Sequence, residues 1–205
     1  MDLHITDVQS LATIDCQIDN CQLSPAKYEI ARQVIYRTAD FEYLSLLQFS
    51  ENSLEHGAAA LAAHTSVIVD RPTVQVGIVS VLQKTFCNPI YCCSTLATRP
   101  QQRKTEAAWG LETMAKNHPQ AIYVIGQEQT ALTTLVELIE RKTIQPALVV
   151  ATPPTFVEQD MKQWLEQSSI PHISVAGNKG NSVVAATIIN SLAELAWQEY
   201  ALNLV

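Results

Sequence analysis

The sequence predicts an α/β fold in which a mainly parallel sheet is flanked by helices on both faces. In the second half of the chain, short apolar runs alternate with amphipathic segments, as strands alternate with their covering helices. The runs are apolar and rich in β-branched residues, which is typical of strands buried on both faces. No linker rich in Pro, Gly or Ser divides the sequence, so we expect a single domain over residues 1–205, with the N-terminal helices packed beside the sheet.

The individual elements follow from caps, breakers and periodicity. Ser24 as N-cap and Pro25 at the first helical position predict a helix that ends near Arg37. A second helix is expected over FSENSLEHGAAALAAH, with Ser50 as its cap. The segment 71–100 is less regular and should contain a helical or bent stretch and one strand. Further strands are expected at 65–70, 121–126, 146–152 and 172–177, and further helices at 99–119, 127–142, 155–169 and 180–202.

Composition excludes several classes of function. The formal net charge is −7, which argues against a general nucleic-acid binder because such proteins need a basic surface for phosphates. There is no run of 18 apolar residues, so we expect no membrane span. The first residues, MDLHITDVQS, carry acids and lack the basic and apolar regions of a signal peptide.

Cysteine and histidine usage points to a cytoplasmic protein without a metal site. The five cysteines form no C-x-x-C pair and are odd in number, which favours reduced thiols. The five histidines are scattered and make no i, i+4 pair or Cys/His cluster, so we expect no metal ligands.

The predicted ligand site lies beyond the carboxyl ends of the parallel strands. Polar segments follow four strands, at Asp70–Arg71, Gly126–Thr130, Thr152–Thr155 and Gly177–Ser182. The last segment, GNKGNS, is a turn before a helix, where backbone N–H groups suit a phosphate or a carboxylate. The alternative is that its two glycines only allow the turn. The sequence contains no dinucleotide fingerprint, P-loop or nucleophile elbow.

One further stretch, ARQVIYRTADFEY, places Tyr36 at the end of the first predicted helix. At helical spacing, Tyr28, Arg32 and Tyr36 form one stripe beside an apolar stripe. Tyr36 is therefore either a packed side chain with a solvated hydroxyl or a proton donor in a site. Spacing alone leaves both interpretations open.

The order of motifs resembles a known family, the precorrin-8X methylmutases, or precorrin isomerases, of cobalamin biosynthesis. The resemblance covers nearly the whole chain. It is carried by SLATID, SPAKYEIARQVIYRTADF, VIVDRPTVQVGI, KTEAAWGL, AIYVIGQEQTALTTLVELIE, PALVVATPPTFV and GNKGNSVVAATIINSL. It implies an α/β domain that works as a homodimer, with the active site near the subunit boundary. It also implies transfer of a methyl group between ring carbons of a corrin precursor, a tetrapyrrole, with no external cofactor.

The resemblance assigns site residues position by position. It matches Ser10, Asp70 and Thr130 to substrate-binding residues of the family, whereas Gln127 stands where the family commonly has Asn. The family's Arg-Ser pair before a helix appears as Lys104 and Thr105, and Lys179 is the cation left in the loop before the last helix.

The largest departure is in the family's R-x-x-H motif. Its Arg falls on Gln33 and its catalytic His on Tyr36, while Arg32 and Arg37 are candidates for a displaced guanidinium. The reference pKa values of a phenol and an imidazole, about 10 and 6.5, correspond to ~4.8 kcal/mol less driving force for proton transfer. We expect Arg37 to lower the pKa of the phenol, and Tyr36 to act as the proton donor or hydrogen-bond partner.

Three functions are consistent with this sequence. The first is an isomerase acting on precorrin-8X or its cobalt form, with Tyr36 at the reactive centre. The second is a non-catalytic relative that binds or delivers a tetrapyrrole. The third is a structural or regulatory dimer partner that has lost the pocket.

Overall fold

The computed structural model describes residues 4–18, 21–96, 104–156 and 160–202. Six strands form one sheet in the order β1-β6-β5-β4-β2-β3. Only β1 runs antiparallel to its neighbour, and the other pairs are parallel, which confirms the predicted α/β class. The strands are β1 (Leu47–Phe49), β2 (Val67–Val69), β3 (Ile90–Cys92), β4 (Ile122–Ile125), β5 (Leu148–Ala151) and β6 (His172–Val175).

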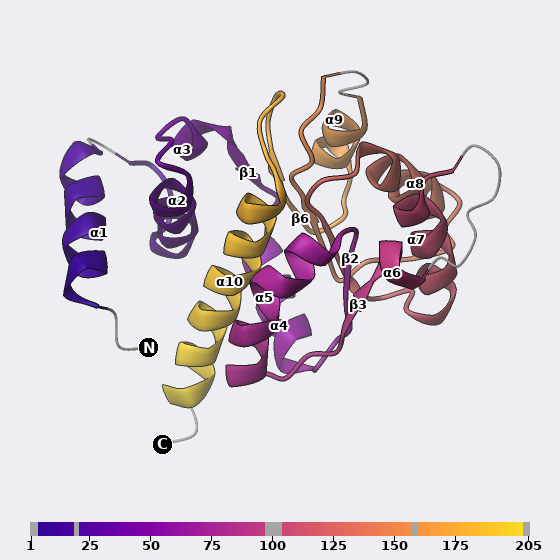
Figure 1. Cartoon of the computed structure of the whole chain (residues 1–205), viewed down its shortest axis with the longest axis horizontal. Helices are drawn as coiled ribbons and strands as arrows, with labels where there is room; N and C mark the ends of the chain where they lie inside the picture. The colour runs from indigo at the N-terminus through magenta and orange to yellow at the C-terminus, as the bar shows by residue number, and fades with distance from the viewer. Residues whose placement is uncertain (1–3, 19–20, 97–103, 157–159, 203–205) are drawn as a thin grey trace.

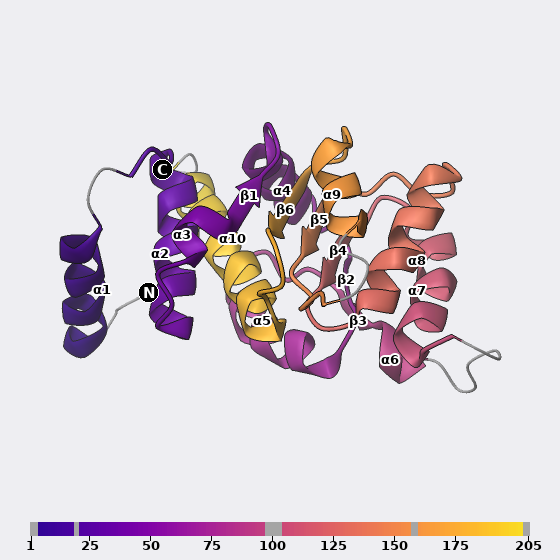
Figure 2. The ribbon, with the colours of Figure 1, turned by 90° about the horizontal axis from the view of Figure 1, so that it is seen from above.

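Helices cover both faces of the sheet, as the apolar strands predict (Figures 1 and 2). The described helices are α1 (Ile5–Gln17), α2 (Pro25–Thr38), α3 (Tyr43–Leu46), α4 (Ser53–Ala62), α5 (Pro72–Lys84), α6 (Cys93–Leu96), α7 (Glu106–Asn117), α8 (Gln129–Glu140), α9 (Asp160–Gln167) and α10 (Ser182–Leu202).

Successive strand residues enter two separate cores, because side chains alternate across a sheet. In β4, Val124 belongs to the core under α2, α4, α5 and α10. Its neighbours Tyr123 and Ile125 belong to the core under α7, α8 and α9. All three side chains are fully buried.

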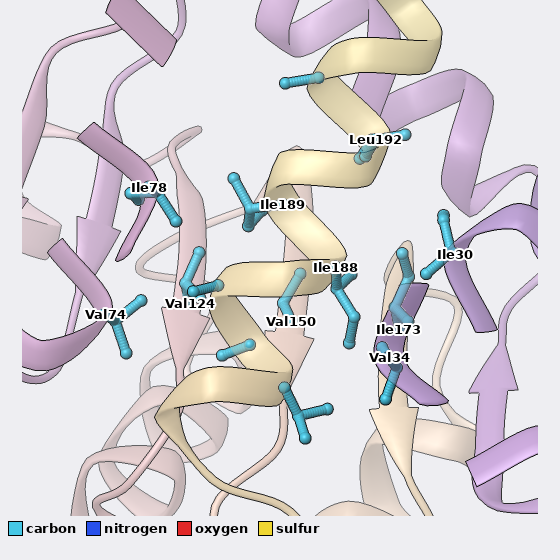
Figure 3. Packing of buried hydrophobic residues seen from close by; sticks show 14 of the residues in the cluster. Ile30, Val34, Val74, Ile78, Val124, Val150, Ile173, Ile188, Ile189 and Leu192 are labelled. Atoms are coloured by element: carbon cyan, nitrogen blue, oxygen red, sulfur yellow. The ribbon is translucent and has the colours of Figure 1, made fainter. Parts of the chain in front are cut away.

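The long helix α10 is the centre of the first core. Figure 3 shows Ile188 and Ile189 of α10 between α2 on one side and α5 on the other, over strands β4, β5 and β6. Both isoleucines are fully buried, and each such side chain contributes about 1.5–3 kcal/mol of transfer free energy. Helix α10 thereby fixes α2 and α5 relative to the carboxyl edge of the sheet.

Helix α1 lies at the end of the molecule and packs against α2, with Leu11 and Ile14 buried between them. Figures 1 and 2 place α1 and α7 at opposite ends of the longest axis. This arrangement agrees with the prediction of N-terminal helices beside the sheet.

Most predicted elements are confirmed, but the segment after α2 is different from the prediction. Residues 47–49 form the antiparallel edge strand β1, which the sequence pattern did not indicate. The predicted cap Ser50 is wrong: α4 begins at Ser53 after Asn52, and the Ser50 hydroxyl accepts a hydrogen bond from the backbone N–H of His172 instead. Ser50 therefore helps to join the sheet edge to β6. The starts of the helices predicted at 99–119 and 155–169 include residues outside the described ranges.

Gly110 allows α7 to approach the start of α6, and we expect its replacement to destabilise the fold. A Cβ at this position would lie 2.0 Å from the carbonyl oxygen of Cys93, a backbone atom that cannot move freely. Gly110→Ala should lower the free energy of unfolding by about 1–3 kcal/mol or more, measured by chemical denaturation. Thr113→Ala, on the exposed side of the same helix, is the control. Equal stability of both variants would contradict the close approach.

Candidate functional site

At the carboxyl edge of the sheet, Asp70 organises the turn that follows the neighbouring strand. Its carboxylate accepts hydrogen bonds from the backbone N–H groups of Gly126, Gln127 and Glu128, at 3.1, 2.7 and 2.7 Å. The side chain is fully buried, and this burial raises its pKa, although the three N–H groups act in the opposite direction. The structure thus brings the predicted residues Asp70 and Gln127 together. The Asp70 carboxylate binds backbone N–H groups of the chain itself.

A polar cluster extends from this turn toward α7. Arg71 donates to the Glu128 carboxylate through Nε at 2.9 Å and forms an ion pair with it. Thr105 is the N-cap of α7, and its hydroxyl lies 2.8 Å from that of Thr130 in the first turn of α8. Lys104, just before the N-cap, pairs with Glu112 about two helix turns into α7. The predicted residues Lys104, Thr105 and Thr130 therefore lie together at this end of the edge.

The loop between β6 and α10 is fixed by several contacts to its backbone. The hydroxyl of Thr152 donates to the carbonyl oxygen of Asn181 at 3.0 Å. A Cβ at Gly180 would lie 2.3 Å from the carbonyl oxygen of Thr152, and φ there is +129°, so glycine is required for this approach. The Lys179 side chain leaves this loop and pairs with Asp40 at 2.5 Å and with Glu42 at 2.9 Å. Lys179 thereby joins the loop to the turn after α2.

Lys162 of α9 supports the same loop from below the surface. Its side chain is only 3% exposed, and its ammonium donates to the carbonyl oxygens of Gly177 and Lys179 at 3.1 and 3.3 Å. Burial lowers the pKa of Lys162 to about 8, while the nearby Glu166 acts in the opposite direction. Sequence analysis missed this residue because its partners are backbone carbonyls, which leave no pattern in the sequence.

The stripe of Tyr28, Arg32 and Tyr36 faces α1. Tyr28 donates to Asp15 at 2.6 Å, and Arg32 pairs with the same carboxylate at 2.8 Å. The Tyr36 hydroxyl donates to Asp7 at 2.7 Å. The two aspartates are eight residues apart on α1, as are the two tyrosines on α2, and this equal spacing is a signal that could have predicted the pairing.

Tyr36 is consequently less acidic than expected. The hydrogen bond to Asp7 is the main reason why its pKa is raised, and desolvation adds to this. Arg37 lies over the Tyr36 ring, 5.2 Å from the centroid, and acts to lower the pKa, but its effect is the smaller one. The expected effect of Arg37 on the phenol is thus confirmed in its direction, but the hydrogen bond to Asp7 outweighs it and the net pKa of Tyr36 is raised.

A cleft of about 420 Å³ lies between α2, α5 and α10. On α2 it is lined by residues close to Tyr36 in the sequence. The predicted residues Gln33 and Arg37 line it. Burial raises the pKa of Glu194 on the opposite wall. The amide of Asn190 donates to the carbonyl oxygen of Gly77, while its buried Oδ1 has no partner among the described residues. The other lining residues, none of them predicted, are Glu29, Val81, Lys84, Thr85, Thr187, Ser191, Trp197 and Gln198.

The predicted residues thus form two groups. Arg32, Gln33, Tyr36 and Arg37 lie on α2, and Ser10 lies on α1, where its hydroxyl donates to the carbonyl oxygen of Thr6. The second group lies at the carboxyl edge of the sheet and includes Lys104 and Thr105, which directly precede α7. Helix α7 lies at the end of the long axis opposite to α1 (Figure 2). One chain therefore keeps α1 and the start of α7 apart.

Other features of the molecule offer little for a metal or a membrane. Within the described ranges, no group of three His, Cys, Asp or Glu side chains is placed to hold a metal ion. No described helix has the length and apolar character needed to cross a membrane. All five cysteines, which lie in the described part, are unpaired. An open groove of about 690 Å³ includes His56 and His118 and contains none of the predicted site residues.

Comparison with known proteins identifies the family. The family described as precorrin-8X methylmutase matches residues 6–195, which include both groups of predicted residues. The chain belongs to the precorrin-8X methylmutase family. This confirms the resemblance seen in the sequence motifs.

Individual precorrin-8X and cobalt-precorrin-8 methylmutases agree with this assignment over four fifths or more of their length. A cobalt-precorrin-8 methylmutase from Synechocystis sp. is 37% identical over 207 aligned positions, covering 94% of this chain and 95% of that protein. One from Methanocaldococcus jannaschii is 30% identical and covers 84% and 81%. The crystal structure of the precorrin-8X methylmutase from Thermus thermophilus has a TM-score of 0.85 at 28% identity, covering 95% and 96%.

The buried Lys162 predicts a defined dependence of stability on pH. Because its folded-state pKa of about 8 lies below the ordinary 10.5, the unfolded chain binds more protons between these values, and this group makes the protein more stable as pH rises. Between pH 7 and pH 9.5 the gain should be about 2 kcal/mol. Lys162→Met should remove this component, measured as the difference between variant and parent in denaturation at both pH values. Parallel pH profiles would show that Lys162 titrates normally.

Proposed function

We propose that this protein is a precorrin-8X or cobalt-precorrin-8 methylmutase that moves a methyl group from one ring carbon of the corrin precursor to the next. The observation that carries the proposal is the match to residues 6–195, since it spans the α2 segment with Tyr36 and the loop before α10. Methylmutases of this family are isomerases, and the rearrangement requires no external cofactor.

In this proposal the chain binds the macrocycle and stabilises its protonated form. Tyr36 is the group at the reactive ring nitrogen. The polar residues predicted from the family hold ring edges and peripheral carboxylates. These residues are Ser10, Arg32, Gln33, Arg37, Lys104, Thr105, Gln127, Thr130 and Lys179, while the buried Asp70 acts through the Gly126–Glu128 turn that it holds. Arg37 is the better candidate for the displaced guanidinium, because Arg32 is already paired with Asp15 and Glu29.

We further propose that the working unit is a homodimer in the cytoplasm, each chain being one domain over residues 1–205. The separation of α1, which contacts Tyr36 through Asp7, from α7, which begins after Lys104 and Thr105, supports a shared site in which a second chain supplies Lys104 and Thr105 (Figure 1). A two-fold axis brings the same pair of surfaces together twice, which gives two such sites per dimer.

A non-catalytic tetrapyrrole carrier is the second candidate, and one observation favours it. The Tyr36 hydroxyl donates its proton to Asp7, Tyr36 is not among the residues that line the cleft, and its pKa is raised. A protein that only binds a macrocycle has no need of an acid at this position, whereas a methylmutase must stabilise a protonated ring by other means.

Turnover of precorrin-8X separates the two candidates. Incubation with the purified protein should produce the absorbance change of hydrogenobyrinic acid formation, and Tyr36→Phe should abolish it while retaining product binding. Tyr28→Phe, which removes a hydroxyl from the other tyrosine–aspartate contact, is the control and should be active. Tight product binding without turnover by the parent would support the carrier, and absence of binding would exclude both candidates.

A shared site predicts complementation between two inactive variants. Tyr36→Phe and Lys104→Glu, co-expressed with different tags, should form mixed dimers in which one of two sites is intact. Random pairing then restores about one quarter of the parent activity. A mixture of Tyr36→Phe with the double variant carrying both changes should remain inactive. Failure of the first mixture to exceed this control would place Tyr36 and Lys104 in separate sites or in one chain.

A further inference from the structure

The direction of the Tyr36 hydrogen bond determines what its hydroxyl can offer to a ligand. A phenol has one proton to donate and two lone pairs that accept. In this structure the proton is directed to Asp7 Oδ1, 2.7 Å away. What remains available to a bound molecule is a lone pair of the phenol oxygen, so the side chain is an acceptor on its free side.

The surroundings of Tyr36 keep this arrangement in place. A phenol keeps its proton at neutral pH, and the hydrogen bond to Asp7 raises its pKa further, so the hydroxyl remains a donor to Asp7. Arg37 lies over the ring face and restricts the ring from one side. The side chain is half-buried, packed against the first core.

We propose that Asp7 is a positioning residue that makes Tyr36 a hydrogen-bond acceptor, and that Tyr36 receives an N–H group of the bound tetrapyrrole. This inference rests on the proposed methylmutase function. The resulting chain runs from ring N–H to phenol O–H to carboxylate, and each hydrogen bond polarises the next. No proton leaves the tyrosine; the negative charge behind the phenol favours the protonated, cationic form of the ring.

In this arrangement Tyr36 does not have to act as an acid. A phenol is a poor donor to a ring nitrogen, since transfer would create a phenolate. An acceptor backed by a carboxylate avoids that species and stabilises a ring already protonated from solvent. The methyl group migrates within this protonated ring, and stabilising the bound protonated form raises the fraction of the complex that can react, so Asp7 should act on kcat more than on KM.

The alternative is that Asp7 only docks α1 onto α2, and the chain itself provides the matched control. Tyr28 and Asp15 make the same kind of contact, 2.6 Å long, eight residues away on both helices. Tyr28→Phe therefore loses one tyrosine–aspartate hydrogen bond between α1 and α2 without changing Tyr36. Docking alone predicts equal effects of the two losses on activity.

The experiment is a double-mutant cycle on Asp7 and Tyr36. Asp7→Asn keeps an oxygen that can accept from the phenol but removes the charge, and we expect kcat with precorrin-8X to fall roughly 10- to 100-fold at nearly constant KM. In the Tyr36→Phe background the same change should have no further effect, because the phenol that connects Asp7 to the ring is gone. Tyr28→Phe should keep the parent kcat. Where Tyr36→Phe turnover is undetectable, the cycle is measured as affinity for hydrogenobyrinic acid.

Each outcome has a distinct meaning. An active parent whose kcat is unchanged by Asp7→Asn would overturn the inference and leave the proposed function intact. Additive effects of Asp7→Asn and Tyr36→Phe, or an equal loss in Tyr28→Phe, would assign Asp7 to helix docking alone. An inactive parent would refute the proposed function first, and product affinity that depends on Asp7 only when Tyr36 is present would still support the hydrogen-bond chain.

Discussion

The carboxyl edge of the sheet depends on one buried carboxylate. Asp70 leaves water completely, which is costly unless the charge is compensated, and the compensation comes from three backbone N–H groups of the turn after β4. That requirement fixes where β4 ends and where α8 begins. Glu128, held at the start of α8, can then pair with Arg71, and Thr130 meets the cap of α7. The polar edge that a ligand would meet is therefore organised by a residue that is itself inaccessible.

The second determinant is α10, which positions α2 against the same sheet. Through Ile188 and Ile189, α10 packs between α2 and α5. This packing places Gln33 and Arg37 of α2 on the wall of the cleft. Helix α1 is attached differently, through a few apolar contacts, two tyrosine–aspartate hydrogen bonds and the Arg32–Asp15 ion pair. Exposed polar contacts of this kind contribute little stability each. Helix α1, whose Asp7 contacts Tyr36, is thus held less firmly than helix α2, which carries Tyr36.

The sequence predicted the parallel strands well. β2, β4 and β5 are continuous apolar runs, as in VIV at 67–69 and LVVA at 148–151, whereas β6, HISV, keeps only its alternating apolar positions. It did not predict β1, since three residues at an antiparallel edge give no periodicity and the strand is defined by pairing with β6. The family motifs indicated Tyr36, but not Asp7, because a carboxylate supplied by another helix is visible only when the two helices are docked. Lys162 was not predicted for a related reason. Its partners are backbone carbonyl oxygens, which every residue type carries, so the sequence gives no signal for them.

The cations predicted to bind substrate carboxylates are largely paired with acids of the chain itself. Lys179 contacts Asp40 and Glu42, and Lys104 contacts Glu112. These side chains are partly exposed, and ion pairs in such positions contribute little stability. A substrate carboxylate can therefore replace an acidic partner at small cost, whereas the net charge of −7 disfavours anions that make no such exchange. In the proposed function, selectivity for a ligand with several carboxylates would follow from the number of such pairs that it exchanges at once, because each exchange contributes little by itself.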